Sequence, residues 1–123
     1  MELNNSRTKE NLMRAFAGES MARNRYTFAA AAAKKEGYPV LELLFHYTAG
    51  QEKEHAEIFY EYLRGCGCSS VEITAGYPVD EKKDTRALLN YAVHNEEEEH
   101  GLIYPDFAKI AHEEGFQEIA GKF

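Results

Sequence analysis

The sequence predicts an all-α protein built as a four-helix bundle. The chain has 123 residues, and 44% of them are apolar, which suffices for one domain with a buried core. Three long segments carry helical periodicity, one long connection joins the second to the third, and a fourth helical segment begins near the end of the chain. Long helices with one long connection are typical of such a bundle.

The first two helices are marked by clear start and stop signals. The first is expected from about Thr8 to Glu36, since it includes a run of five alanines, the strongest helix-forming residue, at 29–33. Gly37 then provides a stop signal. The second helix is expected to begin near Pro39, a residue favoured in a first helical turn, and to end at Gly65.

A connection rich in Gly, Pro and β-branched residues follows at 65–84, and we expect it to cross the bundle rather than form a tight turn. Asp84 or Thr85 can cap the third helix, which is expected to reach Glu114. Pro105 interrupts that helix, because proline removes one backbone donor, and a kink is expected there.

A fourth helix is expected to start after Gly115, because four apolar residues that follow have helical spacing: Phe116, Ile119, Ala120 and Phe123. A helix of eight residues is marginal on its own. We therefore expect residues 1–123 to form one ferritin-like four-helix domain. Its fourth helix is expected to be truncated, and to be completed by a missing segment or by a partner chain.

Composition excludes several classes of function. The formal net charge is -7, so no basic face is expected and nucleic acid is not an expected partner. No apolar run approaches the roughly 20 residues that span a bilayer, so no membrane association is expected. The N-terminal residues lack the apolar stretch of a secretory signal, which favours a cytoplasmic location.

Cys66 and Cys68 lie in a Gly-rich turn, and the cytoplasm keeps thiols reduced. A C-x-C pair is expected to be a poor intrachain disulfide, because residues so close along the chain do not easily meet the sulfur geometry. The pair also lacks the CxxC spacing of a thiolate metal site. We therefore expect structural loop cysteines, with redox activity or adventitious metal binding as the alternative.

Three glutamates occupy positions where a helix would normally carry apolar core residues. Glu19, Glu52 and Glu96 each have apolar neighbours at three, four and seven residues along the expected helix. Burying several carboxylates together is costly unless a positive charge compensates. Carboxylate oxygens and imidazole suit iron or manganese, and the Glu52-x-x-His55 spacing lets two side chains from one helical turn reach the same ion.

Each of these features has a simpler interpretation. The Glu52/His55 pair by itself is more often solvated, and Glu19 can pair with Arg23 or Arg25 instead of a metal. In the acidic run of the third helix, Glu97 with His100 is a second E-x-x-H that competes with Glu96 and Glu99. The helical phase favours Glu96 and Glu99, and the coincidence on three helices favours a metal cluster.

The sequence also resembles the rubrerythrin family over nearly its whole length. The segments that carry the resemblance are Ser6-Arg7-Thr8, 15–20, 22–26, Gln51-Glu52-Lys53-Glu54-His55-Ala56, 104–111 and 113–116. The resemblance implies a ferritin-like bundle with a non-haem di-iron site, or with other divalent metals such as manganese or zinc. It also implies reduction of hydrogen peroxide to water in oxidative-stress defence, through an NADH- and rubredoxin-linked chain with a rubredoxin-type electron donor.

The resemblance assigns roles to individual residues. Glu19 resembles a terminal iron ligand and Glu52 a bridging one, while His55 resembles the histidine that binds one iron when the reduced metal shifts position. Glu96 and Glu99 match the ligands of the third helix. Two tyrosines resemble those that hydrogen-bond the ligands or bound peroxide: Tyr26 and Tyr104.

Two features of the family pattern are absent from this sequence: the E-x-x-H of the fourth helix and the rubredoxin-like domain with its CxxC motifs. A homo-oligomer, such as a helix-swapped dimer, or a second chain is expected to supply the fourth helix. The alternatives to a peroxidase are a ferritin-like iron-binding protein without turnover and a structural helical dimerisation unit.

Overall fold

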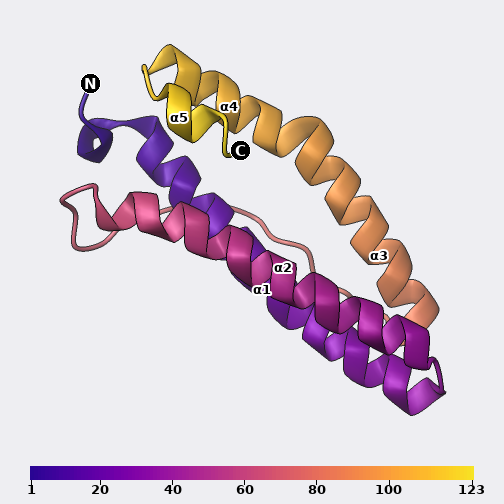
Figure 1. Ribbon diagram of the computed structural model, residues 1–123. Coiled ribbons are helices and arrows are strands. Elements are labelled where there is room, and N and C mark those ends of the chain that lie inside the picture. Colours follow the sequence, from indigo (N-terminus) through magenta and orange to yellow (C-terminus); the bar gives the residue numbers. More distant parts are fainter.

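The computed structural model describes residues 1–123, and every regular element in it is helical. In chain order these are the 3-10 turn η1 (Leu3–Asn5), α1 (Arg7–Glu36), α2 (Pro39–Arg64), α3 (Thr85–Glu98), the π turn η2 (Glu99–Ile103), α4 (Tyr104–Glu113) and α5 (Gln117–Ala120). The all-α prediction is confirmed, and the arrangement is that of a ferritin-like helical bundle (Figure 1). No helix combines the length and apolar character needed to cross a membrane.

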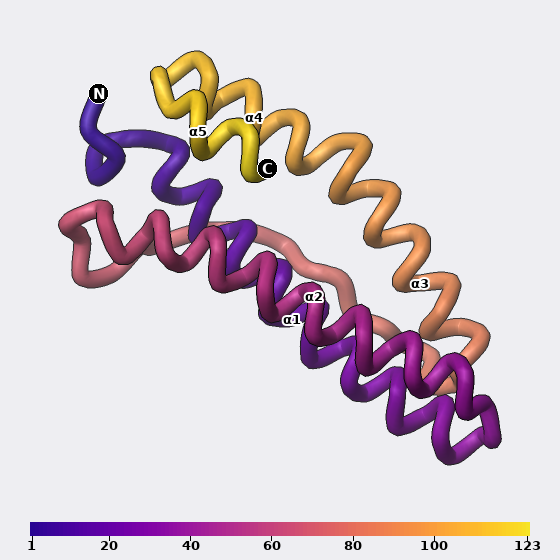
Figure 2. The backbone as a smooth tube through the Cα atoms, in the orientation of Figure 1, coloured from indigo at the N-terminus to yellow at the C-terminus, as the bar shows by residue number.

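Helices α1 and α2 form an antiparallel hairpin and lie side by side along their length (Figures 1 and 2). Gly37 ends α1 in the left-handed conformation with φ 84°, which glycine adopts without steric cost. Small side chains allow the two helices to approach closely. The buried residues of this contact are Ala22, Tyr26, Ala29, Ala30, Ala33, Phe45 and Ala49.

The connection at 65–84 contains no regular element and runs along the surface of α1. The Tyr77 hydroxyl donates a hydrogen bond to the backbone carbonyl of Arg14 at 2.8 Å. Further along α1, the guanidinium of Arg25 lies 3.8 Å from the carboxylate of Asp80. These contacts confirm the expected crossing, and they hold the chain against α1 until α3 begins.

The third predicted helix is present, but its interruption has a different form. Asp84 caps α3 by accepting a hydrogen bond from the backbone N–H of Ala87 at 3.1 Å. The backbone then stays helical through η2 into α4, where Pro105 lies in the first turn. The wider π turn comes directly before the proline, which has no N–H to donate. Such turns in α-helices are frequent at functional sites.

Two carboxylates tie the helix ends together across the molecule. Glu36, the last residue of α1, accepts hydrogen bonds from the backbone N–H and the hydroxyl of Thr85, both at 2.7 Å. Glu114 accepts from the backbone N–H groups of Arg7 at 2.9 Å and Thr8 at 2.8 Å, and from the Thr8 hydroxyl. Both threonines are buried, so each tie satisfies donors that the start of a helix leaves unpaired.

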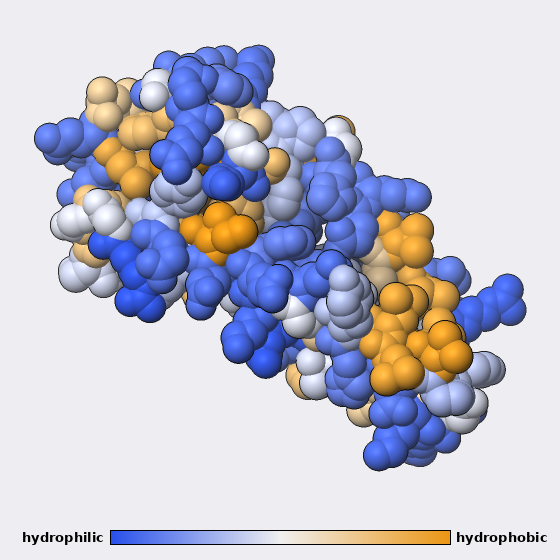
Figure 3. Space-filling view, viewed as in Figure 1, coloured by the Kyte–Doolittle hydropathy of each residue, from blue (hydrophilic) through white to orange (hydrophobic).

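The short helix α5 packs its apolar residues onto the end of the bundle where the N-terminus also lies (Figure 1). It begins one residue after Phe116, and Ile119 is buried there among Leu12, Phe59 and Tyr104. At the opposite end, where α2 begins, apolar side chains gather on the surface (Figure 3).

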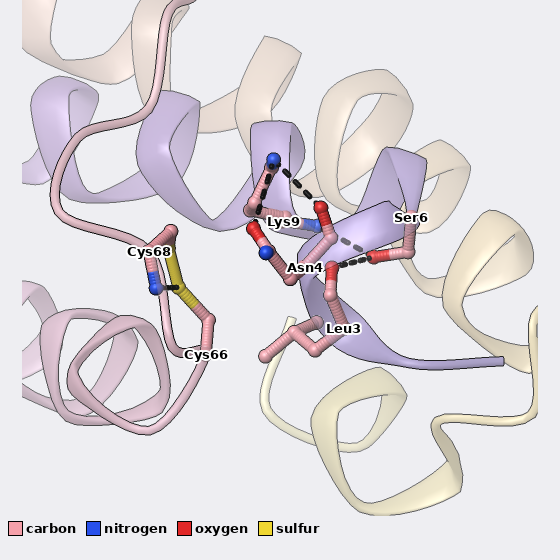
Figure 4. The surroundings of a disulfide bond; sticks show 6 residues. All are labelled: Leu3, Asn4, Ser6, Lys9, Cys66 and Cys68. Carbon is pink, nitrogen blue, oxygen red and sulfur yellow. Dashed lines mark hydrogen bonds between the residues drawn. A yellow bond between two sulfur atoms is a disulfide. The ribbon is translucent and has the colours of Figure 1, made fainter.

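The expectation that Cys66 and Cys68 do not pair is wrong, because the structure joins them in a disulfide (Figure 4). Gly67 between them has φ 75°, in the left-handed region, and this turn brings the two Cα atoms to 5.5 Å. That separation lies within the range that a disulfide spans. The expectation overlooked the freedom that a central glycine gives the turn.

We predict that Thr85→Val destabilises the protein by about 1.5–3 kcal/mol, because it removes a hydrogen bond to a charged carboxylate while keeping the shape of the side chain. The free energy of unfolding in urea measures the change. Thr27→Val is the matched control, since the exposed Thr27 hydroxyl bonds only to the carbonyl of Arg23 in its own helix. Equal, small effects of both substitutions would show that the hydrogen bond from the Thr85 hydroxyl to Glu36 contributes nothing to stability.

Candidate metal centre

Side chains from three parts of the fold line one cavity of about 200 Å³. Glu19 comes from α1, Glu52 and His55 from one turn of α2, Glu96 from the end of α3 and Glu99 from the start of η2. The structure therefore brings together all five predicted metal ligands, Glu19, Glu52, His55, Glu96 and Glu99. Their roles as ligands remain a prediction; their common location is observed.

Glu19 is 2% exposed, and its two carboxylate oxygens have different surroundings. Oε1 accepts a hydrogen bond from the Tyr104 hydroxyl at 2.5 Å. Oε2 is buried and receives no hydrogen bond, and Nδ1 of His55 lies 3.8 Å away. A buried carboxylate oxygen without a donor is rare, because desolvation costs free energy that nothing recovers. A bound cation recovers it, so this oxygen fits a metal ligand.

Glu52 is also buried and shares the same space. Its Oε2 lies 3.9 Å from Nδ1 of His55, and donor atoms of Glu19, Glu52 and His55 all lie within 4.8 Å of one another. Burial, and then the charges of Glu96 and Glu99, raise the pKa of Glu52 from 4.5 to about 8. Two oxygen donors and one imidazole at this spacing form a set that suits iron or manganese.

The third helix presents Glu96 and Glu99 to the cavity, and both are partly buried while Glu97 is exposed. Glu96 Oε1 accepts a hydrogen bond from the Tyr26 hydroxyl at 2.9 Å. Burial, and then the charge of Glu96, raise the pKa of Glu99. Two pairs competed in the sequence, Glu96 with Glu99 and Glu97 with His100. The structure places both members of the first pair at the cavity, as the helical phase predicted.

His100 belongs to the site although the preferred register left it out. Its Nε2 lies 3.1 Å from Oε2 of Glu96, and the ring lines the same cavity. The π turn begins at Glu99 and includes His100, so the helix departs here from regular α geometry. The sequence contained the signal, since His100 closes the second E-x-x-H and also lies four residues after Glu96, the helical spacing that places two side chains side by side.

Tyr26 and Tyr104 hold the carboxylates in place from α1 and α4. Burial, and then the neighbouring charge of Glu96, raise the pKa of Tyr26; burial, and then the charge of Glu99, raise that of Tyr104. Both hydroxyls therefore keep their protons at neutral pH and remain donors. The Tyr104 ring is packed between Phe59 and other aromatic rings, which fixes its orientation.

Two further cavities border the cluster. One, of about 500 Å³, shares Glu99 and Tyr104 and is lined on its other side by α1 and by Tyr77 of the crossing segment. The second is a groove of about 510 Å³ between α2 and α3. Its one end is apolar, with Leu44, Leu89 and Val93, and its other end is formed by Glu52, His55, Glu96 and His100. The carboxylate cluster is therefore open on two sides.

The chain is similar to three proteins named rubrerythrin. It is 46% identical to that of Clostridium perfringens, 49% to that of Porphyromonas gingivalis and 44% to that of Nitratidesulfovibrio vulgaris. The alignments include 98%, 96% and 98% of this chain. They include 63%, 58% and 62% of the relatives, so the chain spans less than two thirds of their length.

A model of the rubrerythrin family matches residues 10–123, which include every residue of the carboxylate cluster. The resemblance seen in the sequence is thus found independently, and it covers α2 to α5 and all of α1 except its first three residues. The chain belongs to the rubrerythrin family.

Proposed function

We propose that this chain forms a non-haem di-iron centre that reduces hydrogen peroxide to water. The observation that carries the proposal is the buried Oε2 of Glu19, which no donor satisfies and which faces Glu52 and His55. The surrounding acidic groups add negative charge, which a bound cation would balance. Membership of the rubrerythrin family supports iron as that cation.

A pair of ferrous ions, when bound, supplies the two electrons that cleave the O–O bond, so that no hydroxyl radical is released. The chain itself supplies the geometry. Tyr104 orients Glu19 through its hydroxyl, and Tyr26 orients Glu96 in the same way. Because each hydroxyl keeps its proton on Oη, it remains a donor to its carboxylate throughout the neutral range.

His55 is proposed as an exchangeable ligand. Its side chain is 54% exposed, whereas those of Glu19 and Glu52 are almost fully buried. The imidazole lies 3.8 Å from one of these carboxylates and 3.9 Å from the other, too far for a hydrogen bond to either. The ring can therefore turn towards a metal or away from it without disturbing the core.

The groove between α2 and α3 is proposed to receive an amphipathic helix from a partner, in a homodimer with exchanged helices or from a second polypeptide. The apolar end of the groove accommodates the apolar face of such a helix, and its acidic end accommodates a metal shared with the helix's polar residues. A rubredoxin-type protein is proposed as the electron donor.

A ferritin-like iron-binding protein without turnover is the second candidate. The small number of closely spaced ligand atoms favours this function. Only Glu19, Glu52 and His55 offer possible metal-ligand atoms that all lie within 4.8 Å of one another. Such a set holds one ion, whereas two-electron reduction of peroxide by ferrous iron needs two. The number of bound ions and the reaction with peroxide separate the two functions.

We predict that the metal-free protein loses stability as the pH rises through the neutral range. The pKa of Glu52 is raised from 4.5 to about 8 on folding, so its contribution is complete below about pH 4.5 and is lost as the pH rises to about 8. The slope is at most about 1.4 kcal/mol per pH unit. Urea unfolding at several pH values measures it. Glu52→Gln cannot ionise and should flatten the curve; an unchanged slope in this variant would contradict the assignment.

We predict that Glu96→Gln weakens ferrous iron binding by about tenfold or more, while Glu97→Gln changes it less than twofold. The reason is that Glu96 lines the cavity and Glu97 is exposed. Anaerobic titration with metal counting measures both. The opposite ranking would favour the Glu97/His100 register, and no binding of iron at micromolar levels by the unsubstituted chain would exclude both metal functions.

We predict that the ferrous protein is oxidised by hydrogen peroxide much faster than by oxygen in stopped-flow mixing. Glu52→Ala should abolish the spectroscopic signature of paired iron, since it removes a buried carboxylate shared by the cluster. Glu54→Ala is the control, because Glu54 is exposed on the same helix. Oxidation by peroxide no faster than by oxygen, with iron bound, would support the iron-binding function without turnover instead.

A further inference from the structure

The only two cysteines of the chain form a small disulfide loop at the end of α2, away from the carboxylate cluster. Cys66 follows Arg64 and Gly65, and Cys68 begins the segment that crosses the molecule (Figure 4). With no third thiol in the chain, this pair has no internal exchange partner. The disulfide can therefore have one of two roles: it stabilises the turn, or it exchanges with thiols and disulfides of other molecules.

Stability is a poor explanation for this disulfide. Closing a loop in the unfolded chain costs entropy that grows with loop length, and here a single residue separates the cysteines. The segments on both sides are held by other contacts. Leu63 and Val71 pack in the same apolar cluster, and the Tyr77 hydroxyl is bonded to α1. Opening the disulfide therefore leaves the end of α2 and the crossing segment anchored.

The turn keeps the two sulfur atoms close in either redox state. Gly67 adopts φ 75°, which side chains other than glycine rarely adopt, and a Cβ there would meet no other atom within 4 Å. The glycine is thus required by the backbone conformation and not by packing. Because a single residue separates the cysteines, we expect the thiols of the reduced pair to stay near one another and to close again.

The two cysteine residues differ in exposure and in hydrogen bonding. Cys66 is 8% exposed, whereas Cys68 is only partly buried. The backbone N–H of Cys68 donates to Sγ of Cys66 at 3.3 Å. An attacking thiolate reaches the more exposed sulfur, and the leaving sulfur departs more readily when its negative charge accepts a hydrogen bond. The geometry therefore favours attack at Cys68 with Cys66 as the leaving group.

We propose that Cys66-Gly67-Cys68 is a thiol–disulfide exchange site that accepts electrons from dithiols and returns them to disulfides. A dithiol's thiolate attacks Sγ of Cys68, the Cys66–Cys68 bond breaks, and Cys66 leaves as a thiolate. The second thiol of the reductant then attacks the mixed disulfide, which releases Cys68 and leaves the reductant as a disulfide. Two electrons pass to the pair, and the reverse sequence reduces an external disulfide. The site does not depend on the proposed metal function.

The test is exchange in the folded, metal-free protein without denaturant. The chain is incubated with graded ratios of reduced to oxidised glutathione, quenched in acid and alkylated, and its thiols are counted by intact mass. We expect complete and reversible reduction within millimolar glutathione buffers, which structural disulfides resist. A pair that stays oxidised in these buffers and opens only after unfolding would overturn the proposal.

Three variants test the geometry. Cys66→Ser should form a mixed disulfide through Cys68 at least tenfold faster than Cys68→Ser does through Cys66. Gly67→Ala should shift the exchange equilibrium towards the dithiol, because alanine strains the closed turn. The double variant Cys66→Ser/Cys68→Ser should keep the urea midpoint of the unsubstituted protein. A large fall in that midpoint, or equal rates for the two single variants, would instead assign the disulfide a structural role.

Discussion

The mutual repulsion of four glutamates in one interior space is the constraint on which the rest of the structure depends. Glu19, Glu52, Glu96 and Glu99 come from three helical segments and line one cavity. Burial and like charges raise the pKa of Glu52 and Glu99. In the metal-free protein these groups therefore either take up protons or, when charged, lower the stability of the fold. A fold that accepts this cost needs strong contacts away from the cluster.

Those contacts are concentrated at the helix ends and in the α1–α2 hairpin. The alanine-rich face of α1 packs closely on α2, while the carboxylates of Glu36 and Glu114 fasten the starts of α3 and α1. Within this frame, Tyr26 and Tyr104 reach two of the four glutamates and hold them by single hydrogen bonds. The two tyrosines belong to the apolar clusters themselves, so apolar packing fixes the hydroxyls that hold the carboxylates.

How far the sequence predicts this structure depends on the range of each interaction. The bounds of α1 and α2 and the inward phase of Glu19, Glu52 and Glu96 follow from local helical spacing, and the sequence predicts them closely. The ties between Glu36 and Thr85 and between Glu114 and Thr8 do not follow, because their partners are 49 and 106 residues apart. The Cys66–Cys68 disulfide is local but depends on a single backbone angle at Gly67, which spacing does not reveal.

The long segment at 65–84 has a consequence for the order in which the protein folds. Contacts within the α1–α2 hairpin are close in sequence and form early, whereas α3 docks only after a long loop closes. This late step carries Glu96 and Glu99 towards carboxylates that the hairpin has already gathered. Without a cation the approach is opposed electrostatically, so we expect a metal ion to act as a template for assembly. With the iron centre proposed above, the availability of iron would then govern how fast the chain matures, before it governs any reaction.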